Sequence, residues 1–109
     1  MENKIIPLPR FESEAKRLIK KHRSFAQDLR NLVEELKSNA LLGVSLGGNL
    51  RKIRLPIGSK GVGKSGGARL ISYVALVQET VYLLTVYDKS ETETVPLSDL
   101  RQLAKSIHK

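Results

Sequence analysis

Residues 51–69, RKIRLPIGSKGVGKSGGAR, decide how the chain is interpreted, because they join two predicted strands through a glycine-rich loop. Residues 50–57 alternate apolar and polar side chains before the loop. Residues 68–77, after the loop, are rich in β-branched and aromatic side chains. The stretch 51–69 holds six basic residues and no acidic one. Two strands with cations at their facing ends predict a surface that binds phosphate.

The loop also matches the phosphate-binding P-loop, G-x-x-x-x-G-K-[ST], at residues 58–65. That motif needs a helix to start at Lys64-Ser65, so that the positive end of the helix faces the bound phosphate. Here Gly66-Gly67 follow, which disfavour a helix, and a strand pattern comes next. A P-loop domain also needs a parallel sheet with crossover helices, for which 109 residues leave little room. We therefore interpret the match as accidental.

Composition limits the chain to one small domain, residues 1–109. It is 40% hydrophobic, which suits a single modest core. It has no cysteine, so disulfides and thiolate metal sites are excluded. No run has the length of a transmembrane helix, and the N-terminus lacks the apolar centre of a signal peptide. We expect a cytoplasmic protein without contact to a membrane.

The formal net charge of +8 is concentrated in the central stretch. Residues 1–50 carry 9 basic and 6 acidic side chains, residues 51–69 carry 6 and 0, and residues 70–109 carry 4 and 5. Positive charge concentrated on an ordered hairpin favours a polyanionic partner, either nucleic acid or an acidic protein segment. The alternative is a generally basic surface without a specific partner.

Hydrophobic spacing predicts the order β-α-α-β-β-β-α. The expected elements are an edge strand at 3–8, a helix at 10–23, a second helix with Ser24 as its N-cap, a loop at 39–49, strands at 50–57, 68–77 and 80–88, and a final helix that begins at Pro96. The prediction is an α+β domain with helices on one face of a small antiparallel sheet.

Alternation along the strands groups the side chains by face. Lys52 and Arg54 share one face of their strand, and Arg69, Ile71 and Tyr73 share one face of the next. Tyr73 is a candidate to stack on a nucleobase, and otherwise it fills a half-buried sheet face.

Three segments of the chain resemble the RelE/HigB-like toxins of bacterial type II toxin–antitoxin systems: LGGNLRKIRLP, GKSGGARLISYV and VYLLTVYDKSE. The segments GKSGGAR and YLLTVYDKSE resemble the HigB-type branch. The resemblance covers most of the chain and implies a RelE-like fold, in which a mixed sheet packs against an N-terminal helical hairpin and a C-terminal helix follows.

The resemblance also implies an activity and its partners. It implies a ribosome-dependent, metal-independent endoribonuclease without a cofactor, which cuts mRNA in the ribosomal A site. A cognate antitoxin, HigA-like or RelB-like, would silence it, and contact with operator DNA would occur through that antitoxin alone. An acidic antitoxin segment could cover the basic hairpin, or it could cover the helical face that carries Lys16, Lys20 and Arg23.

Site residues follow from the same resemblance. The implied catalytic set is Lys52, Arg54, Arg69, Lys89 and Tyr87. From charge and aromatic character we expect Arg51, Lys60, Lys64 and Tyr73 to bind RNA, and we expect no metal ligand. The chain departs from the family at Val95, where well-known members have a catalytic tyrosine, so the general base stays open and Tyr87 is a nearby substitute.

The chemistry of RNA cleavage limits what these residues can do. Attack by a 2′-hydroxyl needs a base, an acid for the leaving oxygen, and stabilisation of the extra charge on phosphorus. Lysine and arginine supply that stabilisation directly. His22 and His108 lie far from the hairpin in sequence, and we expect His22 on the surface at a helix junction. The acidic residues Asp88, Glu91, Glu93 and Asp99 indicate a solvated turn and a helix start.

Three other functions remain compatible with the sequence. A nucleic-acid-binding module would show the same charge distribution without cleaving RNA. A catalytically decayed toxin would act only through its antitoxin. A protein-interaction domain would use the basic hairpin to capture an acidic peptide.

Overall fold

The structure is a computed structural model, and it describes residues 2–60, 67–92 and 94–108. The strands in these ranges are β1 (Lys4–Pro7), β2 (Val44–Gly47), β3 (Leu50–Leu55), β4 (Ala68–Ala75) and β5 (Thr80–Asp88). The α-helices are α1 (Pro9–Lys21), α2 (Phe25–Ser38) and α3 (Leu97–Lys105), and short 3₁₀ turns are η1 (Gly58–Lys60), η3 (Leu76–Gln78) and η4 (Ser106–His108). The α+β fold class is confirmed.

The strands form one mixed sheet in the order β1-β5-β4-β3-β2. β1 runs parallel to β5, and the other neighbours are antiparallel. β1 lies at one edge, as Pro7 at its end and Pro9 shortly after it predict, because proline lacks the N–H that an inner strand must donate.

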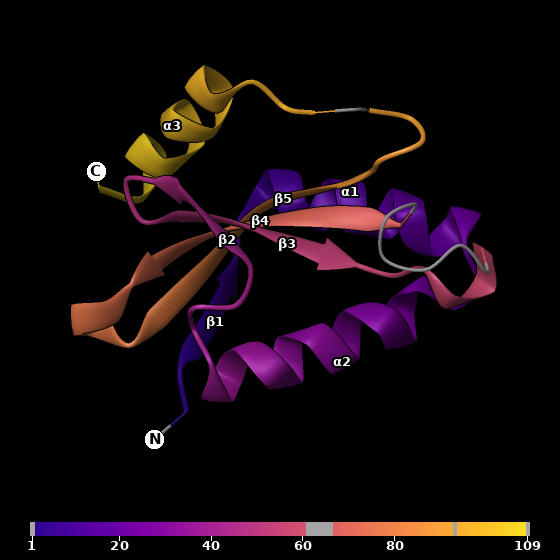
Figure 1. Cartoon of the computed structure of the whole chain (residues 1–109), viewed down its shortest axis with the longest axis horizontal. Coiled ribbons are helices and arrows are strands. Elements are labelled where there is room, and N and C mark those ends of the chain that lie inside the picture. Colours follow the sequence, from indigo (N-terminus) through magenta and orange to yellow (C-terminus); the bar gives the residue numbers. More distant parts are fainter. Residues whose placement is uncertain (1, 61–66, 93, 109) are drawn as a thin grey trace.

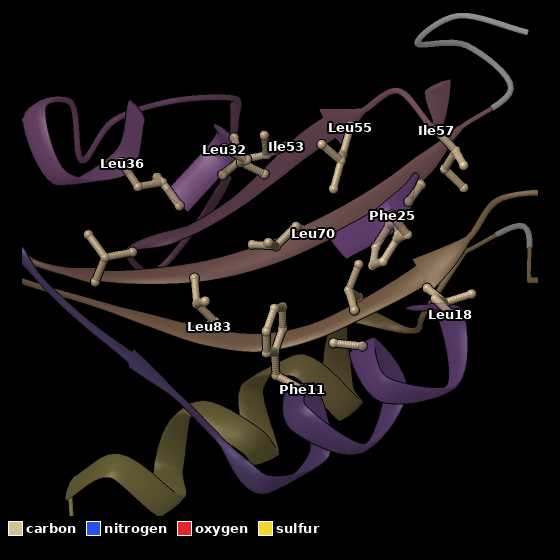
Figure 2. Close-up of a cluster of buried hydrophobic side chains, with 14 residues drawn as sticks. Phe11, Leu18, Phe25, Leu32, Leu36, Ile53, Leu55, Ile57, Leu70 and Leu83 are labelled. Carbon is tan, nitrogen blue, oxygen red and sulfur yellow. The ribbon is translucent and has the colours of Figure 1, made fainter. Parts of the chain in front are cut away.

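The two N-terminal helices pack on one face of the sheet and enclose the main core. Phe11, Ala15 and Leu18 recur at helical spacing along α1 and are all buried. Figure 2 shows the side chains of both helices pointing toward strand residues such as Leu70 and Leu83. This arrangement confirms the predicted helical hairpin.

The prediction that the helices share one face is wrong for α3. Its Leu100 packs on the opposite face of the sheet, in a second cluster with Leu50, Ile71, Leu84 and Tyr87. Figure 1 shows the chain leaving β5 and looping back to bring α3 to this side. The sheet is therefore covered on both faces, and the periodicity of an amphipathic helix does not say which face it covers.

The loop predicted at residues 39–49 is wrong for four of its residues, because Val44–Gly47 is the edge strand β2. Gly48 and Asn49 both have positive φ and join β2 to β3 as a two-residue hairpin turn. A Gly-Asn pair between two apolar runs is a known hairpin signal, so the sequence did contain the information.

Gly67, just before β4, lies very close to the backbone at the end of β3. A Cβ added at this position would lie 2.4 Å from the carbonyl oxygen of Leu55 and 2.9 Å from the Cα of Pro56. The glycine that ends the GKSGG run is therefore required by packing between β4 and the segment after β3.

Gly67→Ala should destabilise the fold by about 1–3 kcal/mol, because backbone atoms must shift to admit the methyl group. Gly58→Ala is the matched control, since its nearest contacts would be ordinary ones at 3.5 Å. Urea unfolding of both variants measures the difference. Equal stability of the two variants would show that there is room for a side chain at position 67.

No helix in the described ranges is both long enough and apolar enough to span a bilayer.

Candidate functional site

Three of the implied catalytic residues form a row across three strands. Arg54 on β3 lies opposite Arg69 on β4, and Arg69 lies opposite Tyr87 on β5. Directly opposite residues project from the same face of a sheet, here the face that α3 partly covers. Lys52 lies two residues before Arg54 and so projects from that face as well.

Four implied catalytic cations line one open groove of about 1030 Å³, here called the basic groove: Lys52, Arg54, Arg69 and Lys89. The groove runs along the part of β3 that extends beyond its pairing with β2. Its opposite wall comes from α2 and includes Asp28, Asn31 and Glu35. Residues 37 positions apart in sequence, Lys52 and Lys89, thus meet at one surface.

A smaller hollow of about 310 Å³ adjoins the groove, and Lys52 lines both. Tyr87 and Val95 line this hollow. The structure therefore places Val95 in the same hollow as Tyr87 of β5. Tyr87 is only 6% exposed, since it belongs to the α3-side cluster.

Arg69 is the main surprise among these residues. The sequence predicts a surface cation at the start of a strand, but the side chain is only 3% exposed. Its Nη1 donates a hydrogen bond to the carbonyl oxygen of Ala68 at 3.0 Å. Arg54 and Tyr87 flank it on the neighbouring strands, so Arg69 is packed within the sheet and is not a surface cation.

The more exposed cations of the groove, Lys52, Arg54 and Lys89, form no ion pair with a carboxylate in the described part of the chain. Like charges on directly opposite strand positions repel, as at Arg54 and Arg69. A bound anion would offset this repulsion, so the groove suits phosphate.

Two residues that we expected to bind RNA, Arg51 and Tyr73, do not line the groove. Arg51 points to the opposite face and donates to the carbonyl oxygens of Leu42 and Gly43 at 3.1 and 2.8 Å, which ties the loop before β2 to β3. Tyr73 lies toward the other end of β4 and makes an edge-to-face contact with Tyr82, with ring centroids 6.3 Å apart.

Two lysines of the loop between β3 and β4 cannot be placed in the same way. The backbone of Lys60 ends η1, but its side chain lies outside the described part of the structure, as does all of Lys64. Their predicted RNA contacts stay predictions.

The described start of the P-loop match, Gly58–Lys60, does not have P-loop geometry. The N–H of Gly58 donates to the carboxylate of Asp28, and the N–H of Ser59 donates to the hydroxyl of Ser24. β4 begins at Ala68, three positions after the motif, where a nucleotide site would need a helix. Ser24 occupies the N-cap position of α2, but its side chain holds η1 instead of capping the helix.

A buried carboxylate beside the site was missed by sequence reasoning. Asp88 is fully buried instead of lying in a solvated turn, and His22 Nε2 lies 3.0 Å from its Oδ2. His22 is at the helix junction as expected, but it is mostly buried by this contact. The side chain of His108, like Glu93, lies outside the described part.

Glu91, three residues after Asp88, pairs with α1. It accepts hydrogen bonds from Arg17, whose Nη2 lies 2.9 Å from Oε1, and from Lys21. These bonds lower the pKa of Glu91 from its ordinary 4.5 to about 2, and they raise the pKa of Arg17. No short-range pattern links residues 74 positions apart, so only the fold reveals this contact.

The depressed pKa of Glu91 predicts acid sensitivity. A carboxyl whose pKa is lower in the folded protein stabilises it fully above its unfolded pKa. This contribution should be lost as pH falls from about 4.5 toward about 2. Urea midpoints measured between pH 2 and pH 7 should fall less steeply for Glu91→Gln than for the parent. Parallel curves would show that the contact contributes nothing.

Among the described residues, no group of three His, Asp or Glu side chains is arranged to hold a metal ion.

No protein-family model matches the chain. Among solved structures, it is similar to the E. coli toxin RelE, in the free state of a double mutant with two arginines replaced by alanine. The TM-score is 0.61 at 19% sequence identity, over 85% of this chain and 90% of that chain. At this identity the likeness shows the fold, which is RelE-like.

Proposed function

We propose that the protein is the toxin of a type II toxin–antitoxin system, of the HigB-type branch, and a ribosome-dependent endoribonuclease that cleaves mRNA in the A site. The whole chain, residues 1–109, would act as a single domain in the cytoplasm. The observation that carries the proposal is the convergence of Lys52, Arg54, Arg69 and Lys89 on one groove of a RelE-like fold. The sequence resemblance nominates the same residues independently of their spatial arrangement.

The basic groove supports the electrostatic part of the reaction. Attack of the 2′-hydroxyl on phosphorus places extra negative charge on the phosphate oxygens. On the sheet face, Arg54 is exposed and Lys52 is partly exposed. Lys89 lines the same groove from the turn after β5. Arg69 lies between Arg54 and Tyr87 across the three strands, so it adds a positive charge beneath the exposed cations.

The residue that removes the proton from the 2′-hydroxyl is proposed from its position in the site. Tyr87 is the general-base candidate, because it neighbours Arg69 in the row and shares a hollow with Lys52. Its low exposure leaves little room for substrate in the free protein. The proposed enzyme therefore depends on the ribosome to bring the 2′-hydroxyl and the phosphate into line, and we expect only weak activity on free RNA.

Mapping of mRNA 5′ ends in a translating extract, with and without the protein, tests the proposal. New ends should appear at A-site codons only while ribosomes translate, and the same RNA without ribosomes should stay intact. Identical ends in both extracts would overturn the assignment. Retention of RNA on the protein without new ends would favour the non-catalytic nucleic-acid-binding module or the decayed toxin.

A cognate antitoxin, HigA-like or RelB-like, is the proposed protein partner. Lys16, Lys20 and Arg23 are exposed on and just after α1, and Ile19, at 40% exposure, lies among them. An apolar side chain within a basic stripe suits an acidic amphipathic segment.

Hydrogen exchange with and without the antitoxin should therefore show protection over residues 16–23. Association should also be faster at low ionic strength, because opposite charges steer the encounter. Protection confined to residues 51–69 would mean that the antitoxin covers the basic hairpin instead, and protection at neither surface would overturn this electrostatic account.

A further inference from the structure

Lys89 differs from the other cations of the basic groove because it lies in a turn and not on a strand. The turn follows directly after β5, and Lys89 is exposed there. Its N–H donates to the carbonyl oxygen of Gly67 at 3.1 Å, and the N–H of Glu91 donates to the carbonyl oxygen of Asp88 at 3.0 Å. The charge of a long side chain acts at a defined point only if the backbone of the turn that carries it is held in place.

The residue before Lys89 is fixed to the end of α1. The carboxylate of Asp88 is fully buried, and its Oδ2 lies 3.0 Å from Nε2 of His22. Its Oδ1 accepts hydrogen bonds from the N–H of Ser90 at 2.9 Å and from the hydroxyl of Ser90 at 2.7 Å. Burial of a carboxylate is unfavourable unless such partners offset its lost hydration, so these contacts hold the strand end firmly.

The residue two positions after Lys89 is fixed to the same helix. Arg17 donates from Nη2 to Oε1 of Glu91 at 2.9 Å and from Nη1 to Oε2 at 3.2 Å, and Lys21 also donates to Oε2. A two-pronged arginine–carboxylate contact restrains direction as well as distance. Because the pKa of Glu91 is about 2, the contact stays charged at physiological pH.

We infer that α1 positions Lys89 at the substrate phosphate through two tethers, His22–Asp88 before it and Arg17/Lys21–Glu91 after it. The inference rests on the proposed function, in which Lys89 contacts the scissile phosphate. None of the residues that make the tethers lines the basic groove. They are therefore positioning residues, and they act on the reaction only through the turn that carries Lys89.

A double-mutant cycle with Glu91→Gln and Lys89→Ala tests this coupling. Glu91→Gln should lower kcat for ribosome-dependent cleavage about 10-fold, with little change in KM, because the substrate still binds while one cation is misplaced. In the Lys89→Ala background the same substitution should have no further effect. Glu14→Gln is the matched control, since Glu14 accepts from Nε of Arg17 at 3.1 Å without any contact to the turn. It should cleave at the parental rate.

Amide hydrogen exchange gives a readout that does not need activity. The amides of Lys89 and Glu91 should exchange faster in Glu91→Gln than in the parent, and at the parental rate in Glu14→Gln. Unchanged exchange in Glu91→Gln would overturn the inference, and so would effects on kcat that multiply in the double mutant. Failure of the proposed function would look different: Lys89→Ala would then match the parent, whereas failure of the tethers leaves Lys89→Ala defective and Glu91→Gln normal.

Discussion

Replacement of Arg54 by alanine should lower A-site cleavage by about 10²–10³-fold, the usual effect of removing one charged or polar contact to a developing anion. Arg54 is exposed on β3, and no carboxylate in the described ranges pairs with it, so the fold does not depend on its charge. The free energy of unfolding should change by no more than about 0.5 kcal/mol, as for most surface substitutions.

Arg30→Ala is the matched control for Arg54→Ala. Arg30 is exposed on α2, outside the basic groove, and donates to Gln27. Cleavage rates from mRNA end mapping and unfolding curves in urea should be measured on all three proteins. Parental cleavage by a folded Arg54→Ala protein would remove Arg54 from the site, and an equal loss in Arg30→Ala would point to net charge as the cause.

Arg69→Ala should abolish cleavage and also destabilise the fold by about 2–4 kcal/mol, since a long side chain that is 3% exposed leaves a cavity when truncated. The substitution also removes the hydrogen bond to the carbonyl oxygen of Ala68. Loss of cleavage in this variant therefore does not by itself identify Arg69 as a catalytic residue.

Arg69→Met separates the two effects, because methionine fills much of the same volume without a charge. We expect most of the lost stability to return in urea unfolding, while cleavage stays at the level of Arg69→Ala. Full activity in Arg69→Met would show that Arg69 supports only the fold. Parental stability of Arg69→Ala would contradict the burial of its guanidinium.

Long amphipathic patterns were the most reliable part of the sequence prediction. The apolar stripe of α1 and the run of β5 predict elements that lie almost where the structure places them. The turn of the β4–β5 hairpin was predicted less accurately, since Leu76 and Val77 were expected in the strand but form the exposed turn η3. Local propensity predicts whether a segment is a helix or a strand better than it predicts the residue at which the element ends. The end depends also on how the chain packs around it.

The candidate site was only partly visible in the sequence. Alternation predicts that Lys52 and Arg54 share a face, and that Arg69 shares a face with Ile71, because side chains alternate along any strand. The strand register that sets Arg54, Arg69 and Tyr87 side by side depends on how three strands pair.

The sequence by itself determined the α+β class, the strands that carry Lys52, Arg54 and Arg69, and the fact that Lys52 and Arg54 share one face of their strand. These properties follow from periodicity within one element, which neighbouring residues set. The tertiary structure alone decided that α3 covers the opposite face, that Arg69 is buried, and that α1 reaches the turn of Lys89 through contacts such as Arg17–Glu91. Burial and contacts between distant segments depend on how whole elements pack, and no short stretch of sequence contains that information.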